Sequence, residues 1–271
     1  MGRRVDASGL VKELRGGEVV GLTSDEQVML STLLEEIQSL ELAEGVSLDE
    51  ADLPMLWRYL KAAQWRLEVG GKRVSTYIQD TFIWRKEMKV SKILSSPTDF
   101  IMKASTGQMF VRGKCKMGRP LIWFYLGRGN TVDPDQNLRF IIFNLERAVA
   151  SFGAEDVESV RNNGQFCVVV DCSFEDGGGF PALATVRHAL SMLALHYPSR
   201  LGSLFVLNAG TMITSVWWGL SFLIKQSTRE KIFFLSGTEE EQQQALRQHI
   251  DPAELEKGNF RAFDPWIYLF G

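Results

Sequence analysis

Cysteine and histidine are scarce in this chain of 271 residues, which contains three of each. Three cysteines cannot build a disulfide framework, so we expect a protein of a reducing compartment. His188 and His196 are eight residues apart, whereas two ligands of one ion on a helix need a spacing of three or four. Cys167 and Cys172 have opposite strand parity, and no cysteine has a base beside it. The sequence therefore favours neither a metal site nor thiol catalysis.

A basic excess, a long hydrophobic run and a targeting signal are also missing. Thirty Lys and Arg residues against 33 Asp and Glu residues give a net charge of -3, which disfavours a nucleic-acid partner. The longest apolar stretch, 212–224, is shorter than the roughly 20 residues that span a bilayer. The N-terminus has no apolar core, and Asp6 stands where a myristoylation signal needs Ser or Thr. We therefore expect a soluble, cytoplasmic monomer without a membrane anchor.

Motifs of enzymes are absent as well. Gly127-Arg128-Gly129 resembles the start of a dinucleotide loop, but Val132 occupies the third glycine position. The run 177–179 is three glycines without the lysine and hydroxyl of a phosphate loop. Asp171 ends an expected strand, where it either acts in catalysis or caps a turn. We expect no enzyme activity, with an α/β enzyme that uses Asp171 as the alternative.

Hydrophobic periodicity divides the chain into two parts. Capping boxes at Thr23 with Glu26 and at Ser47 with Glu50 each predict the start of a helix, and a third helix is expected from Val74 onward. After residue 97, apolar strands alternate with helices, which predicts right-handed crossovers and a mostly parallel sheet. The expected strands are 121–126, 166–171, 204–207 and 231–235, and the expected helices are 138–152, 182–196 and 212–224. We therefore predict an extension at 1–22, a helical lobe at 23–97 and an α/β lobe at 98–271.

The expected helix 212–224 is apolar on more than one side. Ile213, Trp217 and Leu220 form one stripe, and Trp218 and Phe222 lie on another. Such a helix is either fully buried or presents one side to an apolar ligand or a membrane. Adjacent tryptophans favour an interface, where part of a ring stays in contact with water.

Several short motifs resemble the CRAL-TRIO lipid-binding family, in the family's order and over roughly residues 47–260. The N-terminal motifs are Leu56-Trp57-Arg58-Tyr59-Leu60-Lys61-Ala62 and Trp84-Arg85-Lys86-Glu87. The later motifs are Gly118-Arg119-Pro120 before a strand, Tyr197-Pro198-Ser199-Arg200-Leu201-Gly202, Phe205-Val206-Leu207-Asn208-Ala209, and Lys231-Ile232. This resemblance implies an N-terminal helical lobe and an α/β lobe that encloses one hydrophobic ligand under a mobile gate helix at about 214–227. It implies a lipid carrier that exchanges its ligand with membranes by transient contact.

The resemblance also implies site residues. The gate would comprise Ile213, Trp217, Trp218, Leu220 and Phe222. The ligand-binding residues would be Ile122, Phe124, Tyr125, Phe166, Val168, Val170, Ser199, Phe205, Leu207 and Lys231.

Headgroup residues of the family's phospholipid carriers are largely replaced. The phosphatidylinositol positions carry Ala63, Ser199 and Lys231, so that only the lysine remains. An apolar ligand such as a sterol or an isoprenoid fits these changes better than a phospholipid. Haem, which some relatives bind, is an alternative with Tyr125, Cys167 or His196 as axial ligand. A lipid-sensing regulatory module is a further alternative.

Overall fold

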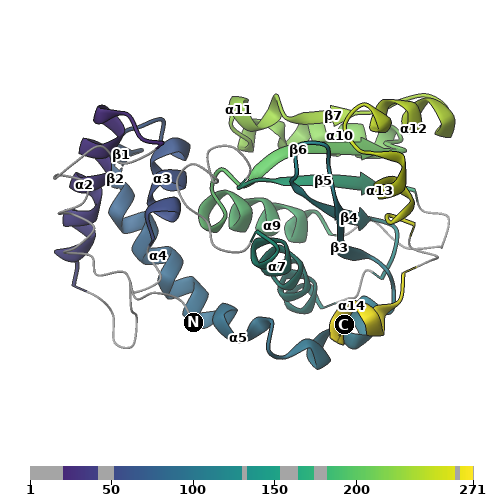
Figure 1. The fold of residues 1–271 in the computed structure, drawn as a ribbon, viewed down its shortest axis with the longest axis horizontal. Helices are drawn as coiled ribbons and strands as arrows, with labels where there is room; N and C mark the ends of the chain where they lie inside the picture. The colour runs from purple at the N-terminus through teal and green to yellow at the C-terminus, as the bar shows by residue number, and fades with distance from the viewer. Residues whose placement is uncertain are drawn as a thin grey trace. The chain divides into compact units, whose positions relative to one another are not determined.

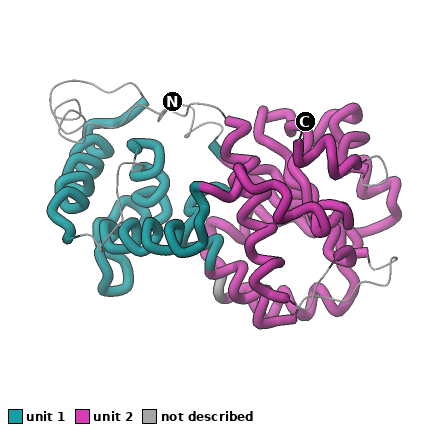
Figure 2. Tube along the Cα trace, turned by 90° about the horizontal axis from the view of Figure 1, so that it is seen from below, with its two compact units in different colours: residues 1–91, 154–164, 192–200 teal, residues 92–153, 165–191, 201–271 magenta. Residues whose placement is uncertain are grey.

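The computed structural model describes residues 21–41, 52–129, 133–152, 164–173, 182–259 and 263–270 (Figure 1). These residues form two compact units (Figure 2). The first unit holds the described residues up to Ser91, together with Gly164 and Met192–Arg200, and the second unit holds the others. The division after Ser91 precedes the boundary expected from the sequence at 97. Residues 1–20 of the expected N-terminal extension lie outside the described residues.

The first unit is built from three helices around one apolar core. Leu30, Leu34, Leu56 and Ile78 are almost completely buried in this core. Their spacing gives each helix one apolar side, which the other helices cover. The elements are α2 (Ser24–Gln38), α3 (Leu53–Ala62) and α4 (Val74–Glu87), with a short hairpin of β1 (Glu68–Val69) and β2 (Lys72–Arg73).

The N-termini of α2 and α3 are capped by side chains, and one of the two expected capping boxes is present among the described residues. Thr23 and Glu26 form the predicted reciprocal box before α2. α3 begins later than expected, because the Asp52 carboxylate accepts the backbone N–H of Met55 and caps the helix there. The other predicted box, at 47 and 50, lies outside the described residues.

The second unit contains a five-stranded sheet in the order β3-β4-β5-β6-β7. β3 is antiparallel to β4, and the other pairs are parallel, which confirms the mostly parallel sheet expected from the sequence. The strands are β3 (Met109–Lys114), β4 (Pro120–Tyr125), β5 (Phe166–Asp171), β6 (Leu201–Leu207) and β7 (Ile232–Phe234).

Helices connect and flank these strands. α7 packs against β3 and β4, whereas α14 packs against η1 and α6. The expected helix 212–224 ends at Leu220, followed by a turn of 3₁₀-helix. Among the described residues, no helix combines the length and the hydrophobicity needed to cross a membrane. The elements are α5 (Val90–Ile93), η1 (Pro97–Phe100), α6 (Ile101–Ala104), α7 (Pro134–Ala150), α9 (Leu183–His196), α10 (Thr211–Leu220), η2 (Ser221–Leu223), α11 (Gln226–Arg229), α12 (Glu239–Arg247), α13 (Pro252–Glu256) and α14 (Pro265–Phe270).

Strand register separates the two faces of the sheet. Ile122, Val168, Leu204 and Ile232 are direct neighbours across four strands, and so their side chains share a face. The next such row adds four more side chains to this face. We call the two rows the apolar face: Ile122, Phe124, Val168, Val170, Leu204, Val206, Ile232 and Phe234.

The opposite face of the sheet is closely covered on its central strands, whereas Phe233 of β7 on this face is 41% exposed. Trp123 and Phe205 are 5% and 1% exposed on this face. A Cβ atom at Gly258, just after α13, would lie 2.5 Å from the Trp123 ring. The Phe205 ring lies 4.8 Å from the ring of His249, which follows α12. The segment around α12 and α13 therefore packs directly on this face.

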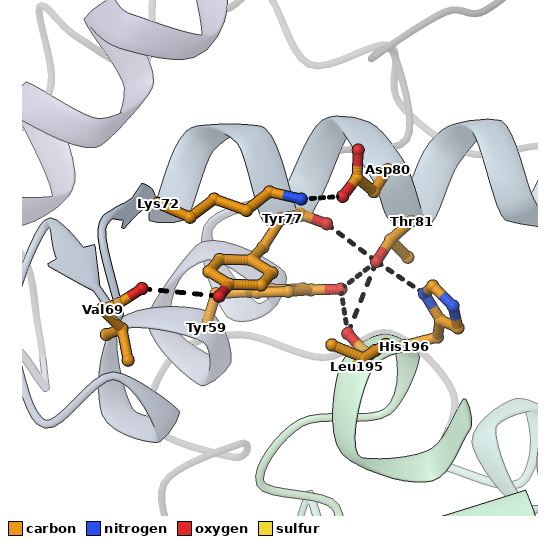
Figure 3. Close-up of polar contacts among 8 residues, drawn as sticks. All are labelled: Tyr59, Val69, Lys72, Tyr77, Asp80, Thr81, Leu195 and His196. Atoms are coloured by element: carbon orange, nitrogen blue, oxygen red, sulfur yellow. Dashed lines mark hydrogen bonds and ion pairs between the residues drawn. The ribbon is translucent and has the colours of Figure 1, made fainter. Parts of the chain in front are cut away.

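The last turn of α9 belongs to the first unit, where a polar network holds it (Figure 3). The Tyr59 hydroxyl lies 2.6 Å from the Thr81 hydroxyl and donates to the Leu195 carbonyl at 3.1 Å. The Thr81 hydroxyl also lies 2.9 Å from Nδ1 of His196, whose ring stacks on Trp84 at 4.1 Å. The bonds satisfy polar groups that are buried in this unit.

Candidate functional site

Part of the apolar face, on β5, β6 and β7, is incompletely buried. Val168, Val170, Leu204 and Ile232 are each only partly buried, whereas Val169, on the opposite face of β5, is 2% exposed. Side chains of a parallel sheet are normally covered on both faces. The apolar face therefore retains hydrophobic surface in the middle of the sheet, where a solely structural core would close tightly.

Helix α9 follows β5, and its central residues are also incompletely buried. Strands β4 to β7 lie side by side in the sheet in the same order as in the chain. Right-handed crossovers between them therefore place α7, α9 and α10 on the same face of the sheet. α7 packs closely on β3 and β4, but the described part of α9 makes no comparable packing with any strand. Its apolar residues Val186 and Leu190 are partly buried, and Leu183 is 43% exposed. Two apolar surfaces, one on the sheet and one on α9, are thus each incompletely buried.

Helix α10 covers the carboxyl end of the apolar face. Ile213 is buried in a cluster with Val206, and the Trp217 ring lies 5.3 Å from the Phe234 ring. The two side chains predicted on another side of this helix point to solvent, with Trp218 77% and Phe222 74% exposed. The segment therefore combines an inner apolar side with exposed aromatic side chains.

The other predicted gate residue, Leu220, is 4% exposed. Ile213, Trp217 and Leu220 therefore lie on the inner side, as their spacing predicts. The aromatic residues Trp218 and Phe222 are the accessible part of the predicted gate.

The structure separates the predicted ligand-binding residues into two groups. Strand parity places Phe166 on the same side of β5 as Val168 and Val170, and the Phe166 ring stacks on Phe152 at 5.9 Å. Ile122 and Phe124 lie on the apolar face with them.

The remaining strand residues of the prediction, Tyr125, Phe205 and Leu207, lie on the opposite face. Each of them is the sequence neighbour of a residue of the apolar face, and successive side chains of a strand point to opposite faces. The Tyr125 hydroxyl donates to the Gly258 carbonyl. Contacts of the described residues therefore assign Tyr125 and Phe205 to the packing with the C-terminal segment.

The two polar residues predicted to contact the ligand hydrogen-bond with backbone carbonyls. Nζ of Lys231 donates to the Leu201 carbonyl at 2.8 Å. Ser199, in the first unit, donates its hydroxyl to the Arg58 carbonyl at 3.3 Å and has a positive φ of 57°. Neither contact creates a cluster of positive charge that would suit a phosphate-rich headgroup.

The three candidate haem ligands are not grouped together on the apolar face. Tyr125 and Cys167 belong to the opposite face, by the parity of their strands. His196 lies in the first unit, where burial is the largest cause that lowers its pKa to about 4. Tyr125 and Cys167 therefore do not fit as axial ligands of a haem bound against the apolar face. Among the described residues, no group of three or more His, Cys, Asp or Glu side chains could hold a metal ion.

Asp171 has the geometry of a turn cap. Its Oδ1 accepts the backbone N–H of Ser173 at 2.8 Å and the side-chain amide of Asn208 at 2.9 Å. Asn208 has a positive φ of 53° and connects β6 to α10. The carboxylate therefore stabilises the chain path at the carboxyl ends of β5 and β6.

Four members of the apolar face were not among the predicted ligand-binding residues. They are Leu204, Val206, Ile232 and Phe234, which lie in the same cross-strand rows as Ile122 and Phe124. Side chains alternate between the two faces along β6 and β7. Once the pairing of the parallel strands is known, this alternation identifies the four residues.

Comparison with known proteins agrees with this architecture. A family model described as the CRAL/TRIO domain matches residues 104–259, which is more than half of the chain. A CRAL-TRIO domain-containing protein of Schizosaccharomyces pombe is 27% identical over 225 residues, covering 79% of this chain and 21% of that protein. Protein real-time of Anopheles gambiae is 22% identical over 221 residues, covering 76% of this chain and 31% of that protein. The chain thus spans less than a third of the length of either relative.

A solved structure shares the fold. The crystal structure of Sfh5 matches with a TM-score of 0.51 and 13% identity, over 80% of this chain and 82% of that chain. The family match, the helical first unit and the mostly parallel sheet of the second agree with the motif resemblance. The chain belongs to the CRAL/TRIO family, a family of lipid-binding and lipid-transfer proteins.

Proposed function

We propose that this chain binds one hydrophobic lipid against the apolar face and exchanges it with membranes. The observation that carries the proposal is the incomplete burial of Val168, Val170, Leu204 and Ile232 beneath a helix, α9, whose own apolar side is incompletely buried. A lipid chain in contact with both surfaces removes them from water. Each buried methylene contributes about 0.8 kcal/mol, so an acyl or isoprenoid chain is strongly favoured over water there.

Membrane exchange requires an aperture that opens at the bilayer. We assign this role to α10 and η2, since Ile213 and Trp217 cover the carboxyl end of the apolar face while Trp218 and Phe222 are exposed. Exposed aromatic rings partition into the interface between water and lipid. Their insertion would supply the free energy that draws the inner side of α10 away from the sheet.

The polar contacts favour a ligand without a large charged headgroup. Lys231 donates to a backbone carbonyl, and the apolar face presents hydrocarbon only. A sterol or an isoprenoid therefore suits the surface better than a phosphoinositide. We infer binding without catalysis, in a cytoplasmic monomer that contacts membranes transiently, and the turn-capping geometry of Asp171 supports this inference.

Organic extraction of the purified protein, followed by mass spectrometry, tests the proposal. We expect one class of hydrophobic molecule in about equimolar amount, and saturable binding of a fluorescent sterol or isoprenoid. Extraction of nothing, together with no uptake of sterol, isoprenoid or phospholipid from vesicles, would refute it. The absorption spectrum of the same sample distinguishes haem, which would give a Soret band.

A lipid-sensing module within a larger protein is the second candidate. It is favoured by the relatives, in which the matched region is 21% and 31% of the full length. In that case, ligand binding changes the affinity for a protein partner, and transfer between vesicles is slow. Pull-down with ligand-loaded and delipidated protein separates the two functions, since a carrier shows the same partners in both states.

A further inference from the structure

A chain of hydrogen bonds holds the residue that follows β6, shortly before α10 begins. Nδ2 of Asn208 donates to Oδ1 of Asp171 at 2.9 Å, and Nε2 of Gln242 donates to Oδ1 of Asn208 at 3.3 Å. Asp171 ends β5, Asn208 follows β6 and Gln242 lies in α12, so that three separate elements of the second unit are joined. We call Asp171, Asn208 and Gln242 the anchor.

The backbone at the anchor is fixed as well. Asn208 has a positive φ of 53°, a conformation that asparagine adopts more readily than most residues. The Gly210 N–H donates to the Asn208 carbonyl at 3.0 Å, and the Cys172 N–H donates to the Leu207 carbonyl at 3.0 Å. Side-chain and backbone hydrogen bonds therefore hold the chain up to Gly210, the N-cap of α10.

Gln242 attaches the anchor to a well-packed helix. This side chain is 6% exposed, and its Nε2 also donates to the Gly237 carbonyl at 3.1 Å. α12 begins with a capping box of Thr238 and Glu241, and its Leu246 is 1% exposed. A buried amide that loses its partner costs free energy, because it is removed from water without a replacement for the hydrogen bond. The contact between Gln242 and Asn208 therefore favours a fixed distance between α12 and the start of α10.

Beyond the anchor, α10 and η2 are held differently. Among the described atoms of residues 211–224, each hydrogen bond joins positions no more than four apart. The inner side of α10 is held by apolar contacts instead. Ile213 and Leu220 are buried there, and the Trp217 ring lies 5.3 Å from the Phe234 ring.

Lipid can replace one of these kinds of contact but not the other. Apolar contacts are non-directional, and a hydrocarbon chain offers the inner side of α10 a surface equivalent to that of the sheet. Hydrocarbon offers no partner to an amide or a carboxylate, so the hydrogen bonds of the anchor would be lost there without compensation. We therefore expect the anchor to stay intact while the inner side of α10 leaves the sheet.

We propose that Asp171, Asn208 and Gln242 are positioning residues that fix the pivot of α10 at 208–210. The helix opens by rotation about this end, and its displacement increases toward η2. Gly210 can absorb the rotation, because a Cβ atom there would meet no atom of the described residues within 4 Å beyond its chain neighbours. This inference rests on the exchange function proposed above, and it adds the place about which the gate turns.

Spin-label distances in the whole chain measure this rotation. Met117→Cys, at a position that is 58% exposed in the β3–β4 turn, carries the reference label. The second label is at Thr211→Cys or at Gly219→Cys, both at exposed positions of α10. The native cysteines are 7%, 0% and 3% exposed, so that the label reacts with the introduced thiols. Pulsed electron resonance gives the two distances with and without phosphatidylcholine vesicles.

The expected result follows from the distance of each label from the pivot. With a rise of about 1.5 Å per residue, Gly219 lies roughly 14 Å along the helix from Gly210, and Thr211 lies roughly 2 Å from it. Vesicles should therefore change the 117–219 distance at least about threefold more than the 117–211 distance. Equal changes would show that α10 detaches as a whole, which overturns the pivot but leaves membrane exchange in place. No change in either distance would overturn the pivot together with the proposed exchange.

Gln242→Ala tests the anchor itself, and Gln244→Ala, at an exposed position of the same helix, is its matched control. In Gln242→Ala, vesicles should change the 117–211 distance about as much as the 117–219 distance, with the stoichiometry of sterol binding unchanged. Gln244→Ala should behave as the wild type. A merely structural role of Gln242 would lower the free energy of unfolding and keep the wild-type ratio of the two changes, and that result would overturn the proposal. The wild-type distances decide the position of the pivot even if Gln242→Ala does not fold.

Discussion

His196 is held in its neutral form by its surroundings in the first unit. Burial lowers its pKa from an ordinary 6.5 to about 4, and its Nδ1 lies 2.9 Å from the Thr81 hydroxyl. The unfolded chain therefore takes up a proton at higher pH than the folded chain does. Stability should be complete above pH 6.5 and decrease as the pH falls toward 4. The loss should be about 1–2 kcal/mol, after allowance for partial exposure of the ring.

Denaturant unfolding at several pH values measures this loss. Carboxylates add their own pH dependence, so the relevant quantity is the difference between the wild type and His196→Gln. In the variant, the unfolding free energy should no longer include the decrease between pH 6.5 and 4 that His196 causes. His188→Gln, at an exposed position of the same helix, is the matched control and should behave as the wild type. Equal slopes for His196→Gln and the wild type would show that His196 is not held neutral.

Gly258 is fitted against the face of an aromatic ring. A Cβ atom there would lie 2.5 Å from three carbons of the Trp123 ring, which is 5% exposed and cannot easily move. Gly258→Ala should therefore cost about 2–3 kcal/mol of the free energy of unfolding. At Gly219, by contrast, a Cβ atom would meet no atom of the described residues within 4 Å beyond the adjoining backbone of its own helix. Gly219→Ala should be neutral or stabilising, and a similar cost at both positions would contradict the close packing around Trp123.

At the scale of residues, the sequence could identify the apolar strands but not the face that each residue occupies. Phe166–Asp171 is nearly continuous in apolar residues, and such a run shows no alternation between buried and exposed positions. The sequence therefore does not separate Tyr125, Phe205 and Leu207 from Val168 and Val170, although their positions along the strands place them on different faces. The contact of Thr81 with His196, 115 positions away, has no local signal at all.

At the scale of elements, α10 is distinguished by the exposure of its outer aromatic side chains. If Trp218 enters the bilayer during exchange, Trp218→Ala removes apolar contact of the order of 2 kcal/mol, and transfer between vesicles should slow about thirtyfold. Transfer of a fluorescent sterol between phosphatidylcholine vesicles measures this rate.

Trp266→Ala is the matched control for that substitution. Trp266 is 62% exposed on α14, compared with 77% for Trp218 on α10. Transfer by the control should match the wild type, and both variants should bind the sterol with unchanged stoichiometry. Equal rates for Trp218→Ala and the wild type would remove α10 from the exchange step.

Among the elements, those with strong periodicity were predictable. The helices α2, α3, α4, α7 and α9 and the strands β4 to β7 all occur near their expected places. β3 was not predicted, because Arg112, Gly113 and Lys114 dilute the apolar alternation in an edge strand that needs only one partner. The end of α10 at Leu220 was also not predicted, since apolar residues continue beyond it and the hydrophobic pattern carries no stop signal.

At the scale of the whole chain, the order of the motifs carried more information than any one motif. The helical first unit and the α/β second unit follow that order, and the family match covers 104–259. Composition could not place the boundary between units, because Pro97, an apparent breaker, begins a short 3₁₀-helix rather than a linker. Nor could it show that Met192–Arg200 belongs to the first unit, which depends on long-range contacts.

Residue-level mapping of a photoreactive lipid tests the central claim most directly. The wild-type protein is loaded with a sterol or isoprenoid that carries a diazirine in its hydrocarbon part, irradiated, digested and sequenced by mass spectrometry. We predict that adducts concentrate at Val168, Val170, Leu204 and Ile232, and on the facing side of α9. Adducts at Val169, Phe205 and Trp123 instead, or adducts that an excess of unlabelled lipid does not displace, would contradict the account.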